Sequence, residues 1–298
     1  MASAGRIALD SASGRGELSY SSADTLADRW AQFAAHAKAE GVGRMERITR
    51  ELVMEYGRNL ANQVASGEMS PAYAQNMISA INTVMRQVRE WKSVSPTKDC
   101  FIQQRSHVRD TPPRGVDRVY LGRALDALRD AGLHRGAAIA ELARELGLRS
   151  KEASLLDTTK ALQQAQTRAM VTVLEGTKGG RTRQVPITSP SQISALSRAS
   201  AIQGGDRNLI PAHQSWRQWR EGELRDARQM LQQHGTDRLH DLRASYACDR
   251  YQQLIGVAAP VMGGQILDRQ ADKEAREKIS NELGHDRIEV TASYVGGR

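Results

Sequence analysis

The sequence has 298 residues, 40% of them hydrophobic and 26% charged, an ordinary composition for a globular protein and a length that allows two domains. Its two cysteines, without a CxxC motif, indicate a reducing compartment and argue against a structural zinc site. The net charge of +8 favours a polyanionic partner, with nucleic acid as the leading candidate. No apolar run is long enough for a membrane span or a leader, so we expect a cytoplasmic protein without a membrane partner.

The N-terminal third of the chain is expected to form a flexible start and a small helical domain. Residues 1–20 are rich in Gly, Ser and Ala, and we expect them to be flexible. Residues 21–94 carry apolar side chains at helical spacing, which predicts an all-helical domain. Its third helix has a clear start, because Ser70 can cap it and Pro71 suits the first helical position. The three predicted helices cover 22–41, 44–66 and 70–91.

Residues 95–116 are polar, basic and rich in proline, and they show no apolar periodicity. This composition predicts an interdomain linker. Beyond it, 117–298 returns to helical spacing and is expected to form a second, mainly helical domain. Two short apolar runs flank the turn 177–180 and predict one small β-hairpin. Four further helices are predicted, at about 190–202, 214–233, 240–254 and 271–283.

Four separated motifs of the second domain carry side chains suited to phosphate chemistry. Taken singly, they are typical of a surface ion pair, a solvated turn lysine, an exposed basic pair on a helix and a packed tyrosine. In chain order they are GLRSKE with Arg149 and Glu152, EGTKGG with Lys178, HDLR with His240 and Arg243, and LGH with His285 followed by Tyr294.

Together, in this order, the four motifs resemble the tyrosine recombinase (phage-type integrase) family. The resemblance covers 117–298, and the helical domain with its basic linker looks like the core-binding (SAM-like) domain of that family. It implies a mainly α fold of the tyrosine recombinase and type IB topoisomerase kind. It also implies a bacterial site-specific DNA recombinase that cuts and rejoins strands through a 3′-phosphotyrosine, for integration or excision of a mobile element or prophage.

The resemblance assigns the central steps to three of these residues. Tyr294 is expected to be the nucleophile, a role open to tyrosine in covalent catalysis. Attack places negative charge on the non-bridging phosphate oxygens. Arg149 and Arg243 carry planar, permanently charged guanidinium groups that suit such oxygens, so we expect them to stabilise the transition state.

Proton transfer and support fall to the remaining residues of the motifs. Lys178, on a turn made mobile by glycines, is expected to protonate the leaving 5′-oxygen. His240 is expected to accept the tyrosine proton, His285 to hydrogen-bond the phosphate, and Glu152 to position the helix of the first arginine. No cofactor and no metal ion is expected, because arginines supply the charge that a metal would otherwise bring.

The expected partner is double-stranded DNA, with the protein a monomer or weak oligomer when free and a homo-tetramer on synapsed sites. Four arginines of the linker and hairpin are candidate contacts to the DNA backbone: Arg105, Arg109, Arg181 and Arg183. Only four residues follow Tyr294, where many family members continue with a docking helix. Assembly is therefore expected to use another contact or a movement of the terminal helix itself.

Three other readings remain open from the sequence. A chain with the recombinase fold could have lost catalysis and act as a DNA-binding factor, although all six polar positions are present. A type IB topoisomerase-like enzyme would share the phosphotyrosine and relax DNA without paired sites. A helix-turn-helix regulator would leave Lys178 and Tyr294 without a role.

Overall fold

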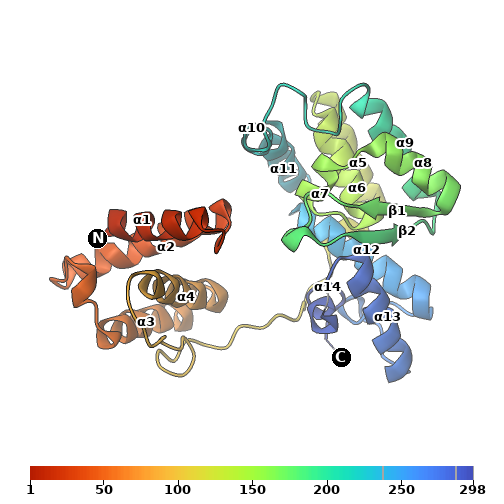
Figure 1. Cartoon of the computed structure of the whole chain (residues 1–298). Coiled ribbons are helices and arrows are strands. Elements are labelled where there is room, and N and C mark those ends of the chain that lie inside the picture. Colours follow the sequence, from red (N-terminus) through yellow and green to blue (C-terminus); the bar gives the residue numbers. More distant parts are fainter. Residues whose placement is uncertain (237, 286, 298) are drawn as a thin grey trace. The chain divides into compact units, whose positions relative to one another are not determined.

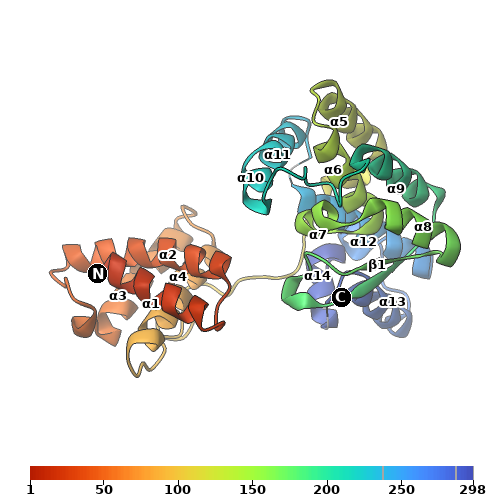
Figure 2. The same ribbon diagram turned by 45° about the horizontal axis from the view of Figure 1, so that its top comes forward.

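The computed structural model describes residues 1–236, 238–285 and 287–297. The chain divides into two compact units, Met1–Ser106 and His107–Arg298, and the division falls inside the predicted linker. Both units are built mainly of helices, and the strands among the described residues form one small two-stranded sheet (Figures 1 and 2). The prediction of a mainly α fold with one small β-hairpin is thereby confirmed. None of the described helices is both long and apolar enough to cross a membrane.

The first unit consists of four helices and one 3-10 turn around an apolar core. In order these are α1 (Ala2–Gly14), α2 (Tyr20–Ala39), η1 (Met45–Arg47), α3 (Arg50–Ala65) and α4 (Pro71–Val88). The Ser70 side chain accepts a hydrogen bond from the Tyr73 amide, so α4 starts at Pro71, as its sequence predicts. The helix predicted over 44–66 is α3, and it starts later than predicted, at Arg50. Thr49 caps it, and the preceding residues form η1.

The N-terminal segment differs from its prediction, because residues 2–14 form helix α1 instead of a flexible start. Leu9 and Ala12 are fully buried, and α1 packs against α2 and α4. A side chain at Gly5 would place its Cβ 2.0 Å from Nε1 of Trp30, so glycine allows the close approach of α1 to α2. The Gly/Ser/Ala composition reflects tight helix packing in this segment.

The first half of the predicted linker also packs onto the first unit. Cys100 and Ile102 of this segment, together with Val94 directly before it, are buried in the core of the first unit. The Asn82 side chain on α4 accepts a hydrogen bond from the Val94 amide and donates one to its carbonyl, at 2.9 and 2.8 Å. Buried residues at such irregular spacing give no secondary-structure signal, which explains why the sequence predicts a linker here.

The second unit contains ten α-helices among its described residues, the hairpin and several 3-10 turns. The elements are η2 (Arg114–Val116), α5 (Arg118–Asp130), α6 (His134–Leu146), α7 (Ser150–Leu155), α8 (Thr158–Arg168), β1 (Met170–Val173), η3 (Lys178–Gly180), β2 (Arg183–Pro186), α9 (Pro190–Gln203), α10 (Trp216–Glu221), α11 (Glu223–Gln233), α12 (Leu239–Ile255), η4 (Pro260–Met262), α13 (Arg269–Glu282), η5 (Ile288–Thr291) and α14 (Ala292–Val295). Helix α6 is buried along most of its length between α5, α9 and α12.

The hairpin forms where it is predicted, with β1 antiparallel to β2 and Val171 opposite Val185. The helix predicted over 214–233 is broken at Gly222 into α10 and α11. Of its two tryptophans, Trp219 is fully buried and donates a hydrogen bond from Nε1 to Ser154 Oγ at 3.1 Å. Trp219 is therefore part of the core of the second unit.

Candidate active site

Five of the six residues predicted to carry the chemistry come together in the second unit. They come from four places in the chain, namely the N-terminus of α7, the first turn of α12, the turn after α13, and α14. The residues are Arg149, His240, Arg243, His285 and Tyr294.

The Tyr294 hydroxyl lies at the centre of this group. It is 3.0 Å from His285 Nε2 and 3.4 Å from Arg243 Nε, which donates to it. Arg149 Nη2 and Arg243 Nη2 each lie 3.4 Å from the same His285 nitrogen. Because Nε2 faces two guanidinium donors and a hydroxyl, the tautomer with an unprotonated Nε2 fits this site.

His240 does not occupy the position that its predicted role as proton acceptor requires. Its ring centroid lies 5.2 Å from that of Tyr294, so the two rings are in contact. The hydrogen bond to the tyrosine hydroxyl is made by His285. In this arrangement the proton acceptor nearest to Tyr294 is therefore His285, where the sequence reading assigned that step to His240.

Arg243 is completely buried and tied to two main-chain carbonyls. Its Nη1 donates to the Gly147 carbonyl and its Nη2 to the Leu283 carbonyl. Burial lowers the pKa of Arg243 to about 10, which still leaves the guanidinium charged at neutral pH. Gly147 has φ +61°, and a Cβ there would lie 2.6 Å from the Tyr246 ring, so glycine brings this carbonyl close to α12.

Glu152 is the buried acceptor beneath the site. Its carboxylate accepts hydrogen bonds from Arg149 Nη1 at 2.6 Å and from the Arg149 amide at 2.7 Å. Arg183 adds a bidentate pair, with both terminal nitrogens at 2.7 Å. Burial alone would raise the pKa of Glu152, but the hydrogen bonds and charges of Arg183 and Arg149 outweigh it and lower the pKa to about 2. The carboxylate thus fixes the start of α7, consistent with the structural role predicted for it.

Both histidines of the site are held neutral at physiological pH. Desolvation, followed by the positive charges of Arg243, Arg149 and Arg183, lowers the pKa of His285 to about 3. Desolvation, Arg243 and Arg149 likewise lower the pKa of His240 to about 4. A neutral imidazole beside the tyrosine hydroxyl can accept a proton from it.

Lys178 lies apart from the other five, on the exposed turn η3. Gly179 and Gly180, with φ of +75° and +70°, form the turn beside it. An open pocket nevertheless connects the hairpin with the group, because Lys178, Arg149 and His285 all line it. Arg181 and Arg287 line the same pocket. The lysine is thus at the rim of the site.

Two of the four candidate DNA contacts, Arg183 and Arg109, are paired with acidic side chains of the protein. Arg183 is 5% exposed and lies between Glu152 and the Glu282 carbonyl, which contradicts a contact to the DNA backbone. Its position follows from strand alternation, because Arg183 faces the same side of β2 as the buried Val185. Arg109 is only partly exposed and pairs with Asp241, the neighbour of His240.

The other two candidate contacts are more accessible. Arg181 is exposed beside the pocket, and Arg105 is partly exposed and donates to Asn76 in the first unit at 3.4 Å. The sequence reading missed the role of Arg183 as partner of Glu152 and that of Asp241 as partner of Arg109. Alternation along β2 was the available signal for the first. The second joins residues 132 positions apart and has no local signal.

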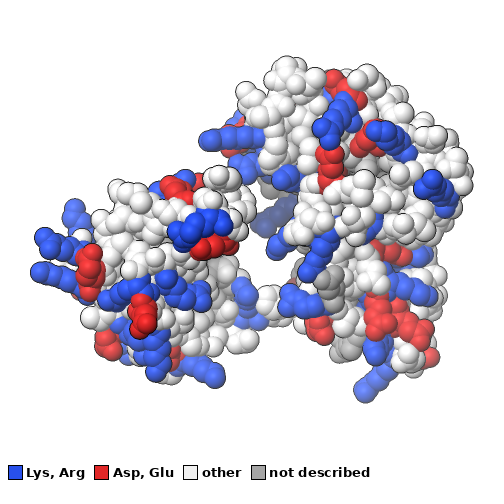
Figure 3. Space-filling model, in the orientation of Figure 1, with Lys and Arg blue, Asp and Glu red and all other residues white. Residues whose placement is uncertain are grey.

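Charged side chains of both signs are spread over the face of the molecule that Figure 3 draws. In the face drawn in Figure 3, arginine and lysine side chains occur over both units with acidic side chains among them. Among the described residues, no group of three or more His, Cys, Asp or Glu side chains is placed to hold a metal ion.

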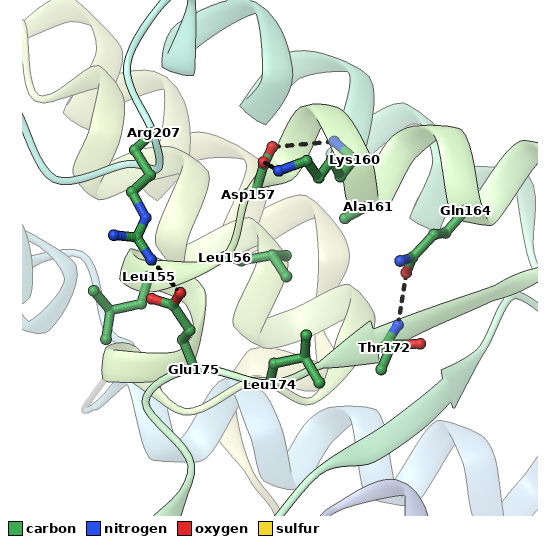
Figure 4. A pocket seen from close by; sticks show the side chains of 10 residues that line it. All are labelled: Leu155, Leu156, Asp157, Lys160, Ala161, Gln164, Thr172, Leu174, Glu175 and Arg207. Carbon is green, nitrogen blue, oxygen red and sulfur yellow. Dashed lines mark hydrogen bonds and ion pairs between the residues drawn. The ribbon is translucent and has the colours of Figure 1, made fainter.

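A second pocket lies between α8, β1 and the end of α7, away from the predicted residues (Figure 4). Its charged side chains pair with one another, Asp157 with Lys160 at 2.9 Å and Arg207 with Glu175 at 2.6 Å. Its remaining lining is largely apolar, including Leu156. These paired charges give it no resemblance to a phosphate site.

Comparison with known proteins supports the family suggested by the motifs. A model of the family described as Integrase matches residues 108–249. No curated protein matches the sequence.

Solved structures share the fold at low sequence identity. The integrase of transposon Tn1549 in complex with circular intermediate DNA is 13% identical, with 99% of this chain and 95% of that chain covered and a TM-score of 0.57. The same integrase with transposon right end DNA is 12% identical over the same shares, with a TM-score of 0.57. The XerH site-specific recombinase bound to palindromic difH substrate is 13% identical, covering 92% and 74%, with a TM-score of 0.55. The fold is therefore that of the tyrosine recombinases. The match of the integrase family model over 108–249 agrees with the predicted tyrosine recombinase (phage-type integrase) family.

Proposed function

We propose that this protein is a site-specific DNA recombinase that cuts and rejoins DNA through a 3′-phosphotyrosine at Tyr294. The observation that carries the proposal is the contact of the Tyr294 hydroxyl with His285 Nε2 and Arg243 Nε, at 3.0 and 3.4 Å. These contacts join a nucleophile to a neutral base and to a buried cation. The similar Tn1549 and XerH structures contain DNA, which supports DNA as the partner.

In the proposed reaction, the Tyr294 oxygen attacks the scissile phosphorus while His285 takes its proton. The bond from phosphorus to the 5′-oxygen breaks, and a 3′-phosphotyrosine forms. Arg243 and Arg149 stabilise the charge on the non-bridging oxygens. Both guanidinium groups are already oriented without DNA, because Glu152 binds that of Arg149 and the carbonyls of Gly147 and Leu283 bind that of Arg243.

Lys178 completes cleavage by giving a proton to the leaving 5′-oxygen. Attack of a 5′-hydroxyl from another strand on the phosphotyrosine reverses the steps and restores Tyr294. The phosphodiester energy is kept in the covalent bond, so strand exchange needs no external energy source. We extend the proposal to integration or excision of a mobile element, on synapsed DNA with four subunits, in the bacterial cytoplasm.

Covalent trapping tests the proposal. A pool of random duplexes, each with a nick, is incubated with the protein and analysed on a denaturing gel. A nick just 3′ of the cleaved bond lets the short leaving strand diffuse away, which blocks rejoining and accumulates the adduct. We expect a denaturant-resistant adduct with the wild type and none with Tyr294→Phe.

Tyr120→Phe is the matched control, since it removes the same hydroxyl from an exposed tyrosine on α5. It should form adduct like the wild type. An adduct that survives Tyr294→Phe would place the nucleophile elsewhere. Salt-sensitive duplex binding with no adduct from any member of a saturating pool would instead favour the DNA-binding protein without catalysis.

A further inference from the structure

The segment that follows Tyr294 is held by a buried arginine of α13. Arg276 is 1% exposed, and its Nη1 and Nη2 donate to the Gly296 and Gly297 carbonyls at 2.9 and 3.0 Å. Its Nε donates to Asp272, one helical turn earlier, at 2.7 Å. One guanidinium therefore binds α13 to the two peptide units just after α14.

The arginine is itself oriented from α12. Tyr251 is fully buried and donates its hydroxyl to Asp272 Oδ1 at 2.8 Å. Asp272 is 2% exposed, so the whole group lies in the core of the second unit. A buried arginine paired in this way has little freedom to leave its position, because unpairing would strand a charge away from water.

The backbone at Gly296 fits the same arrangement. Gly296 has φ +90°, and a Cβ there would lie 2.7 Å from the Val261 amide nitrogen of η4. The first residue of α14 is held as well, by a hydrogen bond from the Arg109 amide to the Ala292 carbonyl at 2.9 Å. The four residues of α14 make too short a helix to hold a fixed position by themselves.

We propose that Arg276 is a positioning residue for the nucleophile: by binding the Gly296 and Gly297 carbonyls, it fixes α14 so that the Tyr294 hydroxyl stays against His285 and Arg243. This inference rests on the proposed function for its effect on cleavage. Arg276 does not touch the site, so its loss should slow adduct formation without weakening DNA binding. A misplacement of a reacting group by about 1 Å costs about 10²-fold in rate.

The test compares Arg276→Met with Arg144→Met. Arg144 is an arginine of the same unit with similar burial, 2% exposed, which donates to the Gly115 carbonyl and to Asp249 and has no hydrogen bond to residues 295–297. Single-turnover adduct formation, duplex affinity, thermal stability and amide hydrogen exchange over 292–297 are measured for both. We expect the adduct rate to fall about 10²-fold for Arg276→Met, with duplex affinity unchanged, and to remain near wild type for Arg144→Met. Arg276→Lys, which keeps the charge, should recover part of the rate.

Gly296→Ala is the second variant, for the case in which Arg276→Met does not fold. This change leaves Arg276, Asp272 and Tyr251 in place and displaces the segment that follows Tyr294. It should therefore slow cleavage in the same way. Equal loss of rate in Arg144→Met and Arg276→Met, or wild-type rates in Gly296→Ala, would overturn the inference.

Hydrogen exchange separates this inference from the proposed function. If the wild type forms no adduct at all, the proposed function fails. The positioning role of Arg276 is then judged by hydrogen exchange alone. The amide exchange rates at 292–297 should rise about tenfold or more in Arg276→Met and stay unchanged in Arg144→Met. Unchanged exchange rates in Arg276→Met would reject the positioning role of Arg276 as well.

Discussion

Arg183 and Glu152 form a bidentate ion pair, two hydrogen bonds of 2.7 Å between side chains that are almost without exposure to solvent. The pair joins β2 to α7, and its carboxylate also binds Arg149. Arg183, a residue of the hairpin, thus supports Arg149, which is the arginine proposed to bind the phosphate.

We expect Arg183→Ala to destabilise the protein strongly. Removing one partner leaves a buried carboxylate with less compensation, which typically costs about 3–5 kcal/mol. Arg181→Ala changes an exposed arginine of the same hairpin and should change the free energy of unfolding by about 0.5 kcal/mol or less. Urea denaturation followed by circular dichroism measures both. Equal stabilities would show that the buried pair contributes nothing.

Acid should weaken the fold through Glu152. Its pKa is about 2 in the folded chain against a usual 4.5. A lowered carboxyl pKa stabilises the fold above pH 4.5, and that contribution is lost as the pH falls toward 2. Glu152→Gln should therefore be less stable than the wild type at pH 7, and the difference should shrink below pH 4.5. A difference that is constant from pH 7 to pH 3 would contradict the lowered pKa.

The two histidines should differ in their importance for cleavage. His285 bonds the Tyr294 hydroxyl, whereas His240 contacts only its ring. Loss of a general base typically costs about 10²- to 10⁴-fold, so His285→Gln should slow adduct formation within that range and more than His240→Gln does. Single-turnover rates at pH 7 measure both. A larger loss for His240→Gln would restore the assignment made from the sequence.

Lys178 is expected to act on the leaving group alone. Lys178→Ala should slow cleavage of an ordinary nicked duplex. A duplex whose scissile 5′-oxygen is replaced by sulfur should be cleaved by this variant at the wild-type rate, because a thiolate leaves without needing a proton. Arg149→Ala removes a group that is proposed to bind the phosphate, and this variant should not be rescued by sulfur. Rescue of both variants, or of neither, would remove Lys178 from this role.

Local patterns were sufficient to predict the mainly helical fold, the hairpin and the likeness to the family, and to select five residues that the fold brings together. Tyr294 and Arg243 are 51 positions apart, and it is the motif order, through the family, that links them. Sequence spacing alone could not show that His285 rather than His240 bonds the tyrosine, because that depends on the turn geometry after α13. The N-terminal helix was missed because Gly5 reads as a flexible residue, although it is the point of contact with Trp30.

The common attachment of two arginines to one carboxylate makes them energetically coupled. Arg149 Nη1 lies 2.6 Å from Glu152, and Arg243 Nη1 lies 3.7 Å from the other oxygen of the same group. Removing either arginine changes the field in which the remaining one is held, so their contributions to catalysis are not separable. A double-mutant cycle of Arg149→Ala and Arg243→Ala, measured on the rate of adduct formation, should give a coupling free energy of about 0.5–3 kcal/mol. The two arginines then behave as one cationic unit centred on Glu152.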